Sequence, residues 1–279
     1  KRKMVMKSMD NLSAYKGINQ FGRAYGIMLK SDIHANNSVD RTIIENMIRL
    51  CDDTKEYLYE SYTNRQVGQI TNLRPELEYF THKLTNEINS TEDKIIKITS
   101  YCSTLGDKIE TDNLDDMVFG GTEEEIIKRG SNWCTDIARV ACIMYQLSGL
   151  SSRIIQLFNI YQAYSGHVVN EVFRNNTWGV VDPTCGFVYE YLDGTPASAW
   201  DIMNKKDGII IKDDRENILE IDFNQFSGVA ISNYYINDHV NYDYSISKIN
   251  QYYRDILEMS NKGWSDGIRW LHNEDNENQ

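Results

Sequence analysis

The sequence predicts an α+β fold in which one helix packs against an antiparallel sheet. Three observations support this prediction. An apolar stripe at helical spacing runs from Ile137 to Leu147, and the pattern then changes to the period of two that is typical of strands over residues 153–183. Helical patterns flank this middle part on both sides. Helices that lie before and after a run of strands, rather than alternating with them, are typical of α+β proteins.

The first hundred residues predict three helices. Apolar residues recur at helical spacing over residues 39–64, and a second helix is expected over 75–89 because proline suits a first helical turn. Ser90, followed three residues later by Asp93, is typical of the start of a third helix. We therefore expect a mostly helical N-terminal region over residues 1–105.

The middle of the chain predicts a short helix over residues 123–128 and then a longer helix that begins near Cys134. Ser131 or Asn132 can cap the N-terminus of the longer helix, because each offers a side-chain oxygen to its free amides. Gly149 is well placed to end it, because glycine favours the left-handed conformation found after many helices.

Three strands are then expected, over residues 153–164, 167–173 and 177–183. The last two are separated by Asn175-Asn176, a residue pair that suits a tight hairpin turn. Further short strands are expected up to residue 240, so that residues 106–240 form one core region. Residues 241–279 are expected to be a helical C-terminal segment that ends in a polar tail.

The composition excludes several classes of function. The formal net charge of −12 argues against binding to nucleic acid or to an anionic membrane, since both need a basic surface. No apolar run approaches the roughly 20 residues of a membrane-spanning helix. The cysteines are odd in number, widely spaced and without a CxxC pair, which fits neither a disulfide framework nor a zinc site: Cys51, Cys102, Cys134, Cys142 and Cys185.

Reduced thiols of this kind favour a cytoplasmic location. The chain begins with lysine rather than methionine, so a removed N-terminal signal stays an alternative. We expect no cofactor and no bound metal.

The predicted hairpin brings a histidine and a carboxylate together. If the two asparagines form the loop, Arg174 opposes Thr177, and alternation along the strands then puts His167 and Asp182 on one face as diagonal neighbours. An imidazole and a carboxylate can meet at that separation. A register slip of one residue would separate them.

Cys134 adds a possible nucleophile to this pair. A thiol at a helix N-terminus lies at the positive end of the helix dipole, which favours the thiolate. A nearby imidazole can accept the thiol proton, and a carboxylate on the other ring nitrogen would fix the tautomer. The free backbone amides of the first helical turn could stabilise an oxyanion. Cys134, His167 and Asp182 therefore form a complete set for nucleophilic catalysis.

These residues lie in motifs that resemble the core of the transglutaminase-like superfamily. The resemblance rests on "GSNWCTDIARVACIMYQLSGLSSRI", "HVVNEV" and "WGVVDPT", and it covers about 60 residues. It implies a papain-like core in which Cys134 is the nucleophile, His167 the general base and Asp182 the orienting acid. The sequence departs from the family in two respects. Gly130 lies four residues before the cysteine, with "SNW" between them, and no upstream side chain stands out as the family's second oxyanion donor.

Other residues near these motifs are candidates for substrate contact, although each has a structural alternative. Trp133 and Trp178 could line a substrate channel or pack in the core. Glu171 has the same strand parity as His167 and could support the sheet or the site. Cys142 and Cys185 are expected to pack.

The main hypothesis is a cysteine-dependent acyl-transfer enzyme that forms a thioester with a peptide, protein or other acyl substrate. Release by water would make it a peptidase or amidase, and release by an amine would make it a transglutaminase or acyltransferase. One alternative is a non-catalytic binding module that uses the same cleft or the helical flanks for a protein partner. A third is a helical interaction protein in which the core is incidental.

Overall fold

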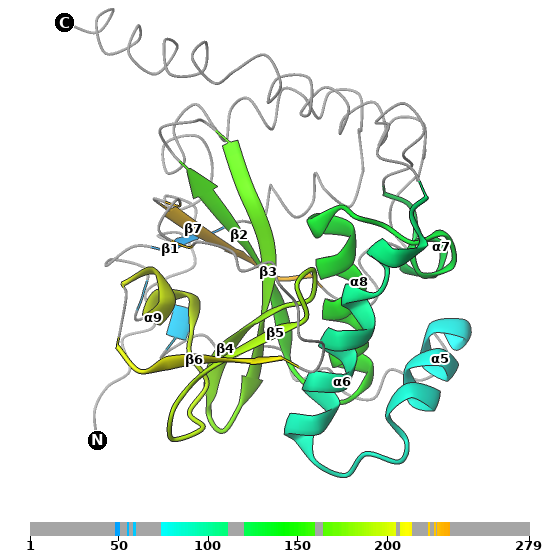
Figure 1. Cartoon of the computed structure of the whole chain (residues 1–279), viewed down its shortest axis with the longest axis horizontal. Coiled ribbons are helices and arrows are strands. Elements are labelled where there is room, and N and C mark those ends of the chain that lie inside the picture. Colours follow the sequence, from blue (N-terminus) through cyan, green and yellow to red (C-terminus); the bar gives the residue numbers. More distant parts are fainter. Residues whose placement is uncertain are drawn as a thin grey trace, which may run out of the picture.

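The computed structural model describes residues 48–50, 55, 58–59, 74–110, 120–159, 164–204, 207–213, 223, 226 and 228–234 (Figure 1). The helices among them are α5 (Pro75–Thr85), α6 (Thr91–Ser103), the 3₁₀ turn η4 (Gly106–Lys108), α7 (Glu123–Arg129), α8 (Cys134–Leu147) and α9 (Ala199–Met203). The strands are β1 (Ile48–Leu50), β2 (Ser152–Asn159), β3 (Tyr164–Arg174), β4 (Thr177–Asp182), β5 (Phe187–Tyr191), β6 (Ile209–Asp213) and β7 (Gly228–Ser232).

The strands form one antiparallel sheet in the order β1-β7-β2-β3-β4-β5-β6. Strands β2 to β6 follow the order of the chain, as expected for strands joined by short connections. The edge pair β1 and β7 joins segments that are far apart in the sequence. The predicted α+β fold, with a helix on an antiparallel sheet, is confirmed.

Each face of the sheet is covered by a separate apolar core. Figure 1 shows α5, α6, α7 and α8 on one side of the sheet and α9 on the other. On the α8 side, Val140 and Met144 pack with Val168 of β3. On the opposite side, Val169 and Val180 pack with Ala199 of α9. Neighbouring residues of β3 therefore belong to different cores, as the two-residue period of a strand requires.

The helices on the α8 side form at the places that the sequence indicates. The Ser90 side chain caps α6 by accepting the Asp93 amide at 3.3 Å. Thr122 and Glu125 cap α7 reciprocally. Gly149 follows the end of α8 with a φ of +81°, a conformation that glycine adopts without strain.

Two predicted elements differ from the structure. The helix expected over residues 39–64 is wrong at residues 48–50, which form β1, because pairing with distant β7 outweighs the local helical pattern. Lys55 is α-helical, and Leu58 and Tyr59 are π-helical. The strand expected over residues 153–164 ends at Asn159, next to a register shift between β2 and β3. The C-terminal helix expected from residue 245 lies outside the described residues.

The predicted division into three regions stays a prediction for the whole chain. Helices α5 and α6 precede residue 105, yet Leu77 and Ile98 belong to the same core as Val140 of α8. The described part of the N-terminal region therefore packs on the helix that carries Cys134.

Candidate active site

Helix α8 begins at Cys134, and the residues just before it are held without a conventional cap. Trp133 is the N-cap residue, and its side chain accepts no hydrogen bond from the first turn. The cap predicted for Ser131 or Asn132 is therefore wrong. The Ser131 hydroxyl instead accepts the Trp133 amide at 3.1 Å, because the chain turns one residue later than the pattern indicates.

The first turn of α8 presents several backbone amides. The first backbone hydrogen bond at the start of α8 is donated by the Ile137 amide to the Trp133 carbonyl at 3.1 Å. The amides of Cys134, Thr135 and Asp136 precede that bond, as in any helix. Cys134 is half-buried, so its sulfur and these amides lie at one partly open helix end.

The hairpin β3–β4 has the predicted register. Asn175 and Asn176 have φ values of +50° and +60°, and Arg174 pairs with Thr177. Two successive positive φ values define the turn whose twist suits a two-residue hairpin, and asparagine adopts them with little strain.

This register brings His167 and Asp182 together at one end of the sheet. Nε2 of His167 lies 2.9 Å from Oδ2 of Asp182. Both side chains are buried. Because Nε2 faces the carboxylate, Nδ1 is the ring nitrogen that remains for Cys134.

The electrostatics of His167 link all three side chains. Burial lowers the pKa of His167, but the charge and hydrogen bond of Asp182 outweigh it, and a hydrogen bond with Cys134 adds to the effect. Together they raise the pKa of His167 to about 10. The imidazole next to Cys134 is therefore protonated at neutral pH.

Asp182 is held so that it can support this charge. Its Oδ1 accepts the amides of Thr184 and Cys185 at 2.9 and 3.1 Å, which leaves Oδ2 for His167. Burial raises the pKa of Asp182, but the charge and hydrogen bond of His167 and the bonds from Cys185 outweigh it, and its pKa is lowered. A carboxylate fixed in this way orients the imidazole.

Two of the predicted substrate-contact residues are instead part of the core. Trp178 is 2% exposed, and the Arg153 guanidinium lies 3.9 Å from its ring centroid. Glu171 is fully buried and pairs with Arg153 Nη2 at 2.7 Å. The structure therefore places Trp178 and Glu171 in the core, and their roles in substrate contact stay predictions. Trp133 is half-buried beside the α8 core, so its role in substrate contact stays a prediction.

Among the other described cysteines, Cys185 contacts the site, because its amide and its side chain both interact with Asp182. Cys102, Cys142 and Cys185 are buried cysteines outside any disulfide, and burial raises the pKa of Cys102. His82 is exposed on α5, whereas Cys51 and the other histidines lie outside the described residues. Within the described ranges, no group of acidic, histidine or cysteine side chains could hold a metal ion, and no helix is long and apolar enough to cross a membrane.

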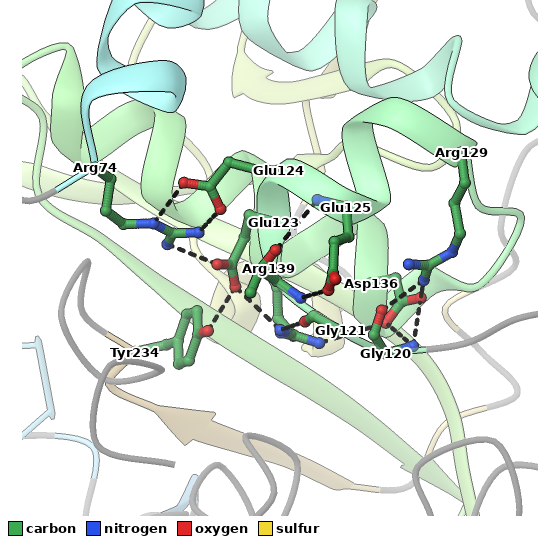
Figure 2. Close-up of polar contacts among 11 residues, drawn as sticks. Arg74, Gly120, Gly121, Glu123, Glu124, Glu125, Arg129, Asp136, Arg139 and Tyr234 are labelled. Atoms are coloured by element: carbon green, nitrogen blue, oxygen red, sulfur yellow. Dashed lines mark hydrogen bonds and ion pairs between the residues drawn. The ribbon is translucent and has the colours of Figure 1, made fainter. Parts of the chain in front are cut away.

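A buried network of charged side chains was not recognised from the sequence. It links Asp136 and Arg139 of α8 with Glu123 of α7 and Arg74, the residue before α5 (Figure 2). The sequence contains one signal for it. Asp136 and Arg139 are charged residues three apart on a helix that is otherwise almost wholly apolar, and buried charges need partners.

A helix that begins at a cysteine and packs on strands bearing a histidine and a carboxylate defines the papain-like class of α+β folds. Residues 78–183 match the family described as the transglutaminase-like superfamily, the family that the motifs resemble.

A solved structure, described as a "putative cysteine protease" from Cytophaga hutchinsonii, resembles the chain with 14% sequence identity and a TM-score of 0.33. The similarity covers 66% of this chain and 64% of that one, so it spans less than two thirds of that protein. A similarity this weak adds nothing to the assignment of the site. A comparison with curated proteins gave no match.

Proposed function

We propose that the protein is a cysteine-dependent acyl-transfer enzyme, in which Cys134 is the nucleophile, His167 the general acid and base, and Asp182 the orienting carboxylate. One observation carries the proposal. The buried imidazole of His167 lies 2.9 Å from Asp182 and near enough to Cys134, at the start of α8, for the thiol to help raise the pKa of the imidazole. A nucleophile, a base in contact with it and a third group that orients the base are the parts that such catalysis requires.

The chemistry follows from these positions. The Cys134 thiolate attacks an amide carbonyl carbon, and the first-turn amides of α8 stabilise the tetrahedral oxyanion. The His167 imidazolium then gives its proton to the leaving amine as the carbon–nitrogen bond breaks, which leaves a thioester on Cys134. A water molecule or a second amine attacks the thioester, His167 takes the proton from it, and the Cys134 thiolate is regenerated.

Hydrolysis and transfer differ only in the acceptor, and both fit this site. With water, the products are a carboxylic acid and the free enzyme; with an amine, the product is a new amide. Which of the two dominates depends on the acceptor that the pocket admits. The substrate is a peptide, a protein or another amide in this proposal.

The proposal is tested by alkylating the protein with chloroacetamide and locating the label by mass spectrometry between pH 5 and 9. We expect Cys134 to react well below pH 8 and much faster than the other cysteines, because the His167 imidazolium lies beside it at the start of α8. His167→Ala should slow alkylation at pH 6 by on the order of 100-fold, within the range for loss of a positioned acid–base group.

Cys142→Ala is the matched control, since Cys142 lies on the same helix but is buried away from His167. Slow alkylation of Cys134 at the rate of the other thiols would reject the enzyme and favour the non-catalytic binding module. If Cys134 is reactive, the adduct that it forms in a cell extract identifies the acyl group by its mass.

A further inference from the structure

Asp136 lies two residues after the proposed nucleophile, in the first turn of α8, and its carboxylate is fully buried. An acidic residue in a first turn usually faces solvent and interacts with the helix dipole. The Asp136 side chain instead points back onto the segment that leads into the helix (Figure 2). A carboxylate removed from water in this way must be matched by several donors.

The donors come from both ends of the segment over residues 120–133. The Gly120 amide lies 3.2 and 3.0 Å from the two oxygens of Asp136. Near the other end, the Ser131 hydroxyl donates to Oδ2 at 3.3 Å. Arg129 joins the two ends, because one of its nitrogens donates to Asp136 at 3.0 Å and to the Gly120 carbonyl at 2.6 Å. One carboxylate thus closes the segment into a loop.

The part of this loop next to Cys134 is held by further contacts on two sides. The Ser131 hydroxyl that donates to Asp136 also accepts the Trp133 amide, and the Ser131 amide donates to the Leu105 carbonyl at 3.1 Å. Gly130 packs so tightly that an added Cβ would lie 2.6 Å from the same carbonyl. The backbone before the nucleophile is therefore fixed from the side of α6 and from the side of α8.

The carboxylate itself is held by a neutral network. Arg139 lies 3.5 Å from Oδ1 of Asp136 and 3.1 Å from Glu123. Glu123 in turn pairs with Arg74 at 2.6 Å and accepts the Tyr234 hydroxyl at 2.6 Å. With Arg129 and Glu124, the network contains three guanidinium groups and three carboxylates. It fixes the orientation of Asp136 through Arg139, whose guanidinium is buried as well.

We propose that Asp136 is a positioning residue for Cys134: its carboxylate clamps residues 120–133 against the first turn of α8 and so fixes the direction of the Cys134 sulfur and of the neighbouring amides. Asp136 makes no contact with reacting atoms in this proposal, which rests on the proposed role of Cys134. Without this carboxylate, residues 120–133 are no longer held against the first turn of α8. The Cys134 sulfur then no longer keeps its position beside His167.

The test is the rate of Cys134 alkylation in Asp136→Asn, measured as a function of pH under conditions in which the variant is fully folded. The amide cannot match two guanidinium groups and a backbone amide as the carboxylate does. We expect alkylation at pH 6 to fall by on the order of 10-fold to 100-fold, as for a catalytic group displaced by about an ångström. We also expect the onset of alkylation to move to higher pH.

Glu190→Gln is the matched control, because it also removes a buried carboxylate, one that pairs with Lys212 in the β5–β6 part of the sheet. It should leave the alkylation rate and pH profile of Cys134 unchanged. If Asp136→Asn does not fold, Ser131→Ala tests the proposal in its place. This variant removes only the hydroxyl that joins Asp136 to the Trp133 amide. We expect a smaller decrease of about 3-fold to 10-fold in the same assay.

A wild-type rate and pH profile in Asp136→Asn, or in Ser131→Ala where that variant decides, would overturn the proposal. That outcome is distinct from failure of the proposed function. If the proposed function fails, Cys134 already reacts slowly in the unmodified protein. If only the role of Asp136 fails, Cys134 reacts quickly in both the unmodified protein and the variant.

Discussion

At the scale of single residues, His167 and Asp182 stabilise each other's charged forms, so their pairing also stabilises the fold in a limited pH range. The pKa of His167 rises from 6.5 to about 10 on folding, so its contribution is complete below pH 6.5 and is lost as the pH rises through 10. The pKa of Asp182 is lowered from 3.8, so its contribution is present above pH 3.8 and is lost at lower pH. The pair therefore contributes most between these two ordinary values.

The free energy of unfolding should fall as the pH rises from 6.5 to 10, and Asp182→Asn should remove most of this alkaline decline. The amide oxygen can still accept the Thr184 and Cys185 amides, but the variant lacks the charge that raises the pKa of His167. We expect the free energy of unfolding of the variant to change much less between pH 6.5 and 10 than that of the unmodified protein, when both are measured by urea denaturation.

Asp193→Asn provides the control, because Asp193 is exposed and accepts a hydrogen bond only from nearby Thr195 among the described contacts. It should keep the alkaline decline of the unmodified protein. An unchanged decline in Asp182→Asn would show that the His167–Asp182 pair does not determine it.

The sequence predicted the relation of His167 to Asp182 because strand parity and a two-residue turn determine it. It did not predict the clamp on Asp136. That carboxylate depends on an amide sixteen positions earlier and on a network that reaches Arg74 and Tyr234. Contacts at such separations follow from tertiary packing, and no local pattern encodes them.

At the scale of elements, the connection between α7 and α8 depends on a glycine, Gly130, that packs closely against Leu105 and Lys108. Gly130 has a φ of +86°, and an added Cβ would lie 2.5 Å from the Cβ of Lys108 and 2.6 Å from the Leu105 carbonyl. Gly130→Ala should therefore lower the free energy of unfolding by about 3 kcal/mol, from the strained conformation together with the clash.

Gly149→Ala separates the two causes. Gly149 has a φ of +81°, but no atom lies within 4 Å of an added Cβ, so only the conformational strain of about 1 kcal/mol is expected. Both values can be measured by urea denaturation. Equal decreases in the free energy of unfolding of the two variants would show that the close contact with Leu105 does not destabilise Gly130→Ala.

The β3–β4 turn maintains the register that the site needs. Asn176→Val should lower the free energy of unfolding by about 1–2 kcal/mol, because a β-branched residue is strained at the φ of +60° found there. Asn176→Gly should leave stability equal or raise it slightly, since glycine is the preferred residue at this position of the turn. A stable Asn176→Val variant in urea denaturation would contradict the turn conformation.

At the scale of the whole molecule, the Arg153–Glu171 pair joins parts of the chain that lie far apart in the sequence. Glu171 of β3 accepts hydrogen bonds from the Tyr59 hydroxyl at 2.7 Å and from the Ala199 amide of α9 at 2.8 Å. Arg153 of β2 donates to the Leu58 carbonyl at 3.1 Å. The N-terminal segment, the sheet and α9 thus meet at one buried ion pair.

Glu171→Gln should lower the free energy of unfolding by about 3–5 kcal/mol, because it leaves the buried Arg153 charge without its partner. The half-buried partner of Arg174, Glu92, offers a comparison. Glu92→Gln should cost at most about 1 kcal/mol, since a partly exposed pair is screened by water. Thermal and urea unfolding of both variants would measure the difference, and equal losses would contradict the structural role of Glu171.

The fold class, the order of α5 to α8 and the hairpin with its register were predictable from the sequence, because helix spacing, caps and turn residues are local signals. The strand β1 was not. Residues 48–50 follow a helical pattern, and they become a strand only because β7 offers an edge to pair with. Segments whose partners are distant are determined by the folded sheet rather than by their own residues.

The pairing of Ile48 with Ile231 also has a consequence for the order of folding. A hairpin with a two-residue loop closes within microseconds, so the strands that carry His167 and Asp182 can meet while most of the chain is still unfolded. The β1–β7 edge must close a loop that contains almost the entire described structure, and non-local pairings of this kind form late. We therefore expect His167 and Asp182 to come into contact early in folding and the β1–β7 pair to form last.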